Sequence, residues 1–143
     1  MLHPANVPII LHFLLELLAI NAFIRRPGLQ LHEKQPTREG VLICYSYAGS
    51  LATLNIICAL YLYFVGISTF GPIGTAMVWS LSSYHVLPMF RAWDRMKRMQ
   101  DPKSGYKTEF DTIAGGPQQH FKGHLFMLCS LMAAGIYGIL EVS

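Results

Sequence analysis

Apolar residues dominate four stretches of the 143-residue chain, and charged residues are almost absent from them. A helix needs about 20 such residues to cross the hydrocarbon core of a bilayer. The pattern therefore predicts an all-α polytopic membrane protein, a single four-transmembrane-helix bundle over residues 1–143. Ser68 and Thr69, with glycines around them, indicate a tight hairpin between the second and third spans. The predicted spans are residues 8–24, 41–67, 70–90 and 121–140.

Composition and charge agree with a membrane protein and orient it. Hydrophobic residues make up 52% of the chain and charged residues 13%, which excludes an ordinary soluble domain. All eleven Lys and Arg residues lie within residues 25–38 or 91–122, and four spans place both segments on one side of the membrane. The positive-inside rule makes that side cytosolic, so we expect cytosolic loops at 25–40 and 91–120 and both termini in the lumen, in the endoplasmic reticulum.

The flanks of the first span and the second loop carry two further expectations. No Lys or Arg precedes the first span and two arginines follow it, so it is expected to be a helix of the mature protein rather than a cleaved signal peptide. The second loop opens with RAWDRMKRM, which predicts that the third helix continues beyond the bilayer. The rest of this loop is long enough to cover an opening of the bundle.

Glu16 is the most informative residue, because it lies near the middle of the first span. An ionisable group at that depth costs about 2.5 kcal/mol or more on insertion scales, so it is usually paired or functional. His12 precedes it by four residues and shares its helix face. Asn21 lies further along the same span. A structural carboxyl group, hydrogen-bonded to Asn21 or to a hydroxyl of another helix, is the alternative to a site role.

Other polar side chains can be placed by depth, counting about 1.5 Å per residue from the charged ends of the spans. By this count His12 and Asn55 lie about 20 Å from the cytosolic interface, in the lumenal half. Four side chains from four different spans fall nearer the cytosol, and we expect them to converge. These are Glu16 at about 13 Å, Tyr47 at about 10 Å, His85 at about 9 Å, and His124 at a few ångströms.

The candidates on the third span have structural as well as functional interpretations. His85 follows Tyr84 and precedes Pro88, where the helix is expected to kink and free its carbonyl groups. A histidine that bridges helices and a catalytic histidine are both consistent with this position. Arg91 is either a cytosolic anchor or, if it turns inward, a charge partner of Glu16.

Several kinds of chemistry lack the residues they require. His120 and His124 are four residues apart, a spacing that can hold a metal, but no H-E-x-x-H motif accompanies them and no metal is expected. Asn55 can join helices as readily as it can bind a substrate. The three cysteines form no C-x-x-C pair, and no P-loop or dinucleotide motif is present, so no cofactor and no nucleic acid are expected.

Four segments together resemble a group of small fungal four-span proteins: HFLLELLAINAFIRRPGLQ, SLATLNIICALYLY, SSYHVLPMFRAWDRM and FKGHLFMLCSLMAAGIY. This group includes membrane-bound epoxide hydrolases or cyclases of aurovertin- and citreoviridin-type polyketide biosynthesis. The sequence departs from the group ahead of the second span, where TREGVLICYSY has no histidine and His32 lies further upstream. The resemblance implies that the functional residues are Glu16, Asn21, Asn55, Tyr84, His85, Arg91 and His124.

Epoxide opening suits these residues, because it needs an acid for the departing oxygen and a base for the attacking water or hydroxyl group. We expect Glu16 to be one partner and His85 or His124 the other, with Tyr84 or Asn55 holding the oxygen. The expected partners are a lipophilic small molecule, membrane lipid and, in a homodimer, a second copy. Two alternatives stay open: a non-enzymatic subunit or assembly factor, and an isomerase or terpene-type cyclase that acts on an alkene.

Overall fold

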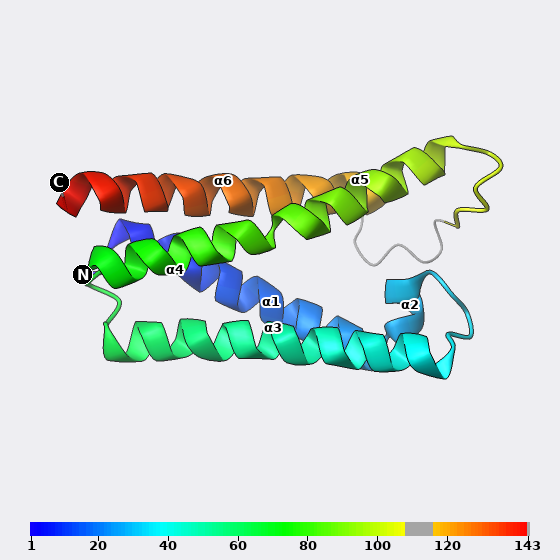
Figure 1. Ribbon diagram of the computed structural model, residues 1–143, viewed down its shortest axis with the longest axis horizontal. Helices are drawn as coiled ribbons and strands as arrows, with labels where there is room; N and C mark the ends of the chain where they lie inside the picture. Colours follow the sequence, from blue (N-terminus) through cyan, green and yellow to red (C-terminus); the bar gives the residue numbers. More distant parts are fainter. Residues whose placement is uncertain (108–115, 143) are drawn as a thin grey trace.

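The computed structural model describes residues 1–107 and 116–142 and is built of helices (Figure 1). No strand occurs in these residues, so the predicted all-α class is confirmed. The expected cover over a bundle opening falls largely on residues 108–115, outside the described part. The helices are η1 (Pro4–Asn6), α1 (Val7–Arg25), α2 (Pro27–Leu31), α3 (Arg38–Phe64), α4 (Gly71–Tyr84), α5 (Val86–Gln100) and α6 (Gly116–Val142).

Three helices are long and apolar enough to cross a membrane: Pro4–Arg25, Arg38–Phe64 and Gly116–Glu141. In the most apolar windows of these helices only 22%, 28% and 28% of the residues are buried, so most of their apolar side chains face outward. An outward apolar surface of this extent is stable in lipid and not in water. These features indicate a helical integral membrane protein.

The expected third span, residues 70–90, is not one helix. It divides at His85 into α4, whose 14 residues cover only about 21 Å, and α5. Pro88 has no N–H to bond the carbonyl of Tyr84, and the Ser82 hydroxyl donates to the carbonyl of Trp79 at 2.8 Å. Both features bend or interrupt helices. The expected kink is confirmed, and α5 continues the chain to Gln100 as predicted.

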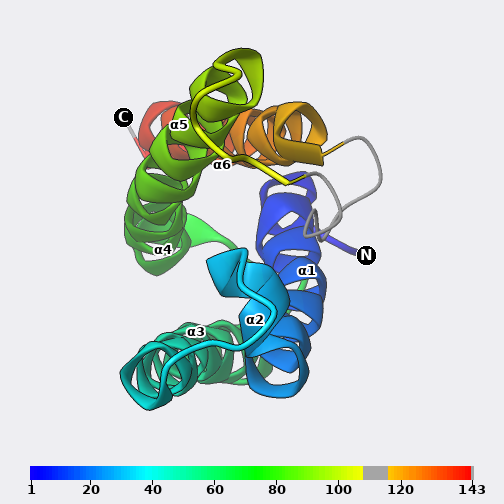
Figure 2. The same cartoon turned by 90° about the vertical axis from the view of Figure 1, so that its right-hand side faces the viewer.

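The helices run antiparallel and form two pairs. One pair is α1 with α3, and the other is α6 with α4 and α5; α1 also contacts α6 and so lies between α3 and α6 (Figure 2). The beginning of the chain, the end of α6 and the connection at residues 65–70 lie at one end of the bundle, and residues 26–37 and 101–107, the basic connections, lie at the other (Figure 1). Within the described residues, the Lys and Arg residues of these two segments therefore lie at the same end of the bundle.

A close approach of α4 and α6 depends on small residues in α6. A Cβ atom added at Gly135 would lie 2.7 Å from the indole nitrogen of Trp79. The absence of a side chain at Gly135 therefore leaves room for the Trp79 ring against α6, and small residues are common where helices pack in membranes. The packing holds the α4–α5 junction against α6.

A buried polar cluster joins the chain ends to the connection between α3 and α4. The Asn6 amide donates to the carbonyl of Thr69 at 2.7 Å and accepts from the Tyr61 hydroxyl at 2.9 Å. His3 lies 3.6 Å from the carboxylate of Glu141. The N-terminus, the hairpin and the end of α6 are therefore tied together, far along the bundle from the basic connections.

Candidate functional site

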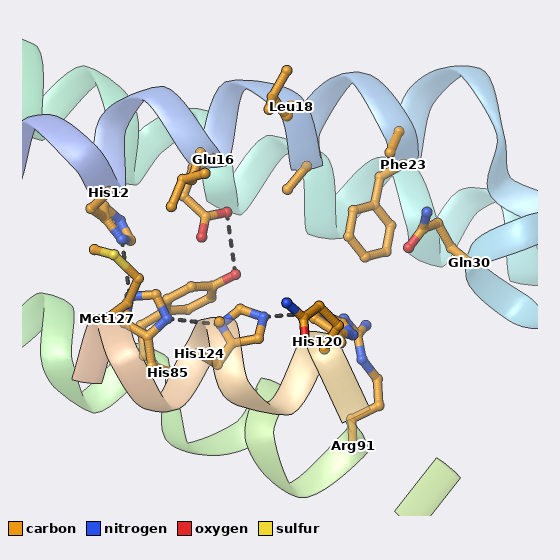
Figure 3. Close-up of a pocket in the computed structure, with 16 residues that line it drawn as sticks. His12, Glu16, Leu18, Phe23, Gln30, His85, Arg91, His120, His124 and Met127 are labelled. Carbon is orange, nitrogen blue, oxygen red and sulfur yellow. Dashed lines mark hydrogen bonds between the residues drawn. The ribbon is translucent and has the colours of Figure 1, made fainter. Parts of the chain in front are cut away.

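A cavity of about 450 Å³ opens between α1, the α4–α5 junction and the first half of α6, with α2 beside it (Figure 3). Its apolar wall comes mainly from α1 and consists of Leu15, Leu18, Ala19, Ala22, Phe23, Gly123 and Met127. Its polar lining comes from all five neighbouring elements and consists of His12, Glu16, Gln30, Tyr84, His85, Arg91, Gln119, His120 and His124. An apolar space into which a few polar groups converge is typical of a small-molecule site.

Glu16 projects from α1 into this cavity and is only 4% exposed. The Tyr84 hydroxyl, at the end of α4, donates to its Oε2 atom at 3.3 Å. The Tyr47 hydroxyl of α3 donates to the Tyr84 hydroxyl at 3.3 Å. Three helices therefore hold one carboxyl group, and a phenol chain fixes its orientation.

Four imidazole rings form a continuous chain along the same cavity (Figure 3). His12 Nδ1 lies 3.2 Å from His85 Nε2, His85 Nδ1 lies 2.8 Å from His124 Nδ1, and His124 Nε2 lies 2.9 Å from His120 Nε2. Both nitrogens of His85 and His124 are therefore engaged with other rings. His12 Nε2 is buried and has no hydrogen-bond partner in the described residues.

The histidines do not form a metal centre. Zinc would require ring nitrogens about 2.0–2.1 Å from a common point. Here the nitrogens face one another in pairs at hydrogen-bond distance. Within residues 1–107 and 116–142, no group of three or more His, Cys, Asp or Glu side chains could hold a metal ion.

Arg91 turns into the bundle. Its guanidinium carbon lies 5.7 Å from the ring centre of Phe23 and 6.0 Å from that of Tyr47. Its Nε atom is buried without a hydrogen-bond partner among the described residues. Arg91 lines the same cavity as Glu16, so it contributes a positive charge to the site's outer end.

α2 is held beside the cavity by a buried contact with α5. The guanidinium group of Arg95 donates to the backbone carbonyl of Gln30 at 2.7 Å. Arg95 is 8% exposed and Gln30 9%. A buried charge-assisted hydrogen bond of this kind is strong. It positions the first connection as a wall of the site.

The structure brings most of the predicted residues together. Glu16, Tyr84, His85, Arg91 and His124 line the cavity, and Tyr47 reaches it through Tyr84. The outcome for the two asparagines differs.

Neither Asn21 nor Asn55 lines the cavity. Asn21 is exposed on the outer side of α1, where it is not hydrogen-bonded to Glu16. Asn55 donates to the backbone carbonyl of Phe13 at 3.0 Å and joins α3 to α1. The predicted convergence is thus found for the titratable groups but not for the two amides.

The sequence reasoning missed two members of the site. It placed His12 in the lumenal half, about 11 Å from His85 in depth, whereas His12 Nδ1 lies 3.2 Å from His85 Nε2. The count estimates depth along each helix and does not include the tilt of one helix against another. His120 was considered only as a metal ligand together with His124, and the structure shows a hydrogen bond between the two rings. The signal for both was present, because each histidine lies four residues from a predicted site residue.

Comparisons with protein-family models, with curated proteins and with solved structures gave no match to the chain. The resemblance to fungal epoxide-opening proteins and the activity it implies therefore stay predictions.

Proposed function

We propose that the chain is a membrane-embedded acid–base enzyme that opens an epoxide of a lipophilic substrate, either with water or with a hydroxyl group of the substrate. The observation that carries the proposal is that Glu16 and His12 line one cavity, and that His12 Nε2 has no hydrogen-bond partner among the described residues. Glu16 and His12 are four residues apart on α1 and share a face. Assignment of the substrate to the polyketides rests on the sequence resemblance alone.

The geometry supports a division of roles. In epoxide opening the attacking oxygen loses a proton while the ring oxygen gains one, so no net proton is consumed. Tyr84 orients the Glu16 carboxyl group through its hydrogen bond. His12 offers the other proton-transfer group, since both nitrogens of His85 and of His124 are already engaged. The apolar wall from α1 suits a lipophilic chain that enters from the membrane.

The proposal includes four spans, with the lumenal termini and cytosolic loops given above, in the endoplasmic reticulum. Residues 71–90, that is α4 and the start of α5, together cover about 30 Å, enough for a fourth span. We predict that a membrane-impermeant maleimide labels Lys103→Cys in sealed microsomes and labels Leu2→Cys only after permeabilisation. The native cysteines are replaced by alanine in both variants. Labelling of Leu2→Cys in intact vesicles would refute this topology.

A long-chain hydroxy-epoxide is the probe that tests the activity. Membranes that contain the protein are expected to convert it, in ¹⁸O-labelled water, to a diol with one heavy oxygen or to a cyclic ether with none. Membranes without the protein provide the control. Conversion of a polyene but of no epoxide would favour the isomerase or cyclase alternative. A folded protein that converts neither would favour the subunit or assembly factor.

A further inference from the structure

The four histidines of the cavity come from three parts of the chain that meet only in the folded bundle. His12 belongs to α1, His85 to the break between α4 and α5, and His120 and His124 to the start of α6. Their three nitrogen–nitrogen distances, 3.2, 2.8 and 2.9 Å, are all hydrogen-bond distances. Four rings are more than a single acid–base pair requires.

The chemistry of imidazole restricts how such a chain can be protonated. A neutral ring has one N–H donor and one acceptor nitrogen. His85 and His124 use both nitrogens within the chain, so each neutral ring must donate once and accept once. All three hydrogen bonds must therefore point in the same direction. Only two arrangements satisfy them, one donating toward His120 and the other toward His12.

We propose that this chain of histidines is a proton relay from His12, inside the bundle, to His120, at the end of the bundle where the basic connections lie. When His12 Nε2 takes up a proton, its Nδ1 proton passes to His85. The His85 Nδ1 proton then passes to His124, and the His124 Nε2 proton passes to His120. His120 releases its Nδ1 proton to water. One proton enters, one leaves, and every ring is neutral before and after.

The two ends of the chain differ in the way that a relay requires. His12 is 1% exposed, and its free Nε2 atom lies at the inner end. His120 is partly exposed, near the beginning of α6 and beside Gln119 at the cavity's outer end. The relay thus connects a buried nitrogen inside the bundle with water at the end of the bundle where the basic connections lie.

Successive protons pass along the relay in opposite directions. After one proton has passed outward, each ring is left in the tautomer that donates its hydrogen bond toward His12. The next proton therefore passes inward, unless all four rings first return to their original tautomers. His12 can thus act first as a base and then as an acid, which suits a reaction with no net proton change. The relay itself goes beyond the proposed function, because it depends on the histidine geometry and not on an epoxide.

Hydrogen exchange of the ring protons tests the relay without any substrate. The protein, labelled with ¹⁵N-histidine, is placed in lipid nanodiscs, and exchange at His12 and His85 is followed by NMR. His120→Gln keeps a hydrogen-bonding amide near the position of Nε2 but cannot pass a proton on. We expect exchange at His12 and His85 to slow by about tenfold or more. The control, His32→Asn, changes a histidine of the first connection outside the chain and should leave both rates unchanged.

A second variant and the wild-type protein complete the test. His124→Gln interrupts the chain in its middle, so exchange should slow at His12 and His85 but not at His120. In the wild-type protein, the ¹⁵N shifts of His85 and His124 should report both tautomers in exchange. The relay would be overturned by a single fixed tautomer at His85, or by an exchange rate at His12 that is the same in both glutamine variants as in the wild-type protein. Either result leaves the epoxide assay to be judged separately.

Discussion

Glu16→Gln is expected to lower the turnover number for epoxide opening by about 10²- to 10⁴-fold, the usual contribution of a general acid or base. Glutamine keeps the size of the side chain and an oxygen that accepts the Tyr84 hydrogen bond, which is 3.3 Å long in the wild-type protein. It removes only the ability to gain or lose a proton. The KM should change little, because the lost interaction belongs to the transition state. Product analysis with the hydroxy-epoxide probe provides the measurement.

The matched control for this variant is Glu39→Gln. Glu39 is exposed in the first turn of α3 and does not line the cavity, so the variant should turn over substrate at the wild-type rate. Thermal unfolding in detergent should show that both variants are folded. Wild-type turnover by Glu16→Gln would remove Glu16 from the mechanism and leave it a structural role.

The second large effect is expected at His12, which sequence reasoning did not assign to the site. The asparagine of His12→Asn reaches the position of ring Nδ1 and keeps a hydrogen bond to His85. It has nothing at the position of Nε2, the buried atom that has no hydrogen-bond partner in the described residues. We expect turnover to fall by about 10²-fold or more, because an amide cannot replace an imidazole in proton transfer.

The same substitution at another histidine controls for loss of an imidazole in general. His3→Asn lies at the opposite end of the bundle, where His3 accepts a hydrogen bond from the backbone of Ala5. Asparagine is a good capping residue, so this contact is retained. His3→Asn should keep wild-type turnover. If His12→Asn also keeps wild-type turnover, the partner of Glu16 in the acid–base pair would have to be His85 or His124 instead.

The site lies where the two helix pairs meet. α1 belongs to one pair and contributes Glu16 and His12, whereas Tyr84, His85 and the α6 histidines belong to the other. The break at His85 lets α5 continue in a direction different from that of α4 (Figure 1). Arg91 on α5 then points into the cavity. A straight third helix would not produce this arrangement.

The sequence alone was sufficient to predict the helices, the kink and much of the site. Long apolar stretches must form helices in a bilayer, because every backbone polar group has to be satisfied internally. A carboxyl group in such a stretch is costly, so Glu16 could be singled out without coordinates. The depth count also selected His85 and His124, and the resemblance to the fungal proteins pointed to Tyr84 and Arg91; all four line the cavity. The resemblance pointed to Asn21 as well, although that side chain is exposed on the outer side of α1.

Only the tertiary structure decided which of these groups meet. Counting residues along a helix estimates the depth of a side chain, but not the direction in which it points or the tilt of its helix. His12 and His85 were therefore separated by the count and are joined in the fold. The four-histidine chain depends on packing between α1, α6 and the break at His85. Contacts between residues that are far apart in sequence depend on how each helix is rotated and on which helices pack against each other. The sequence determined which polar groups enter the bundle, and the packing of its helices determined that they form one site.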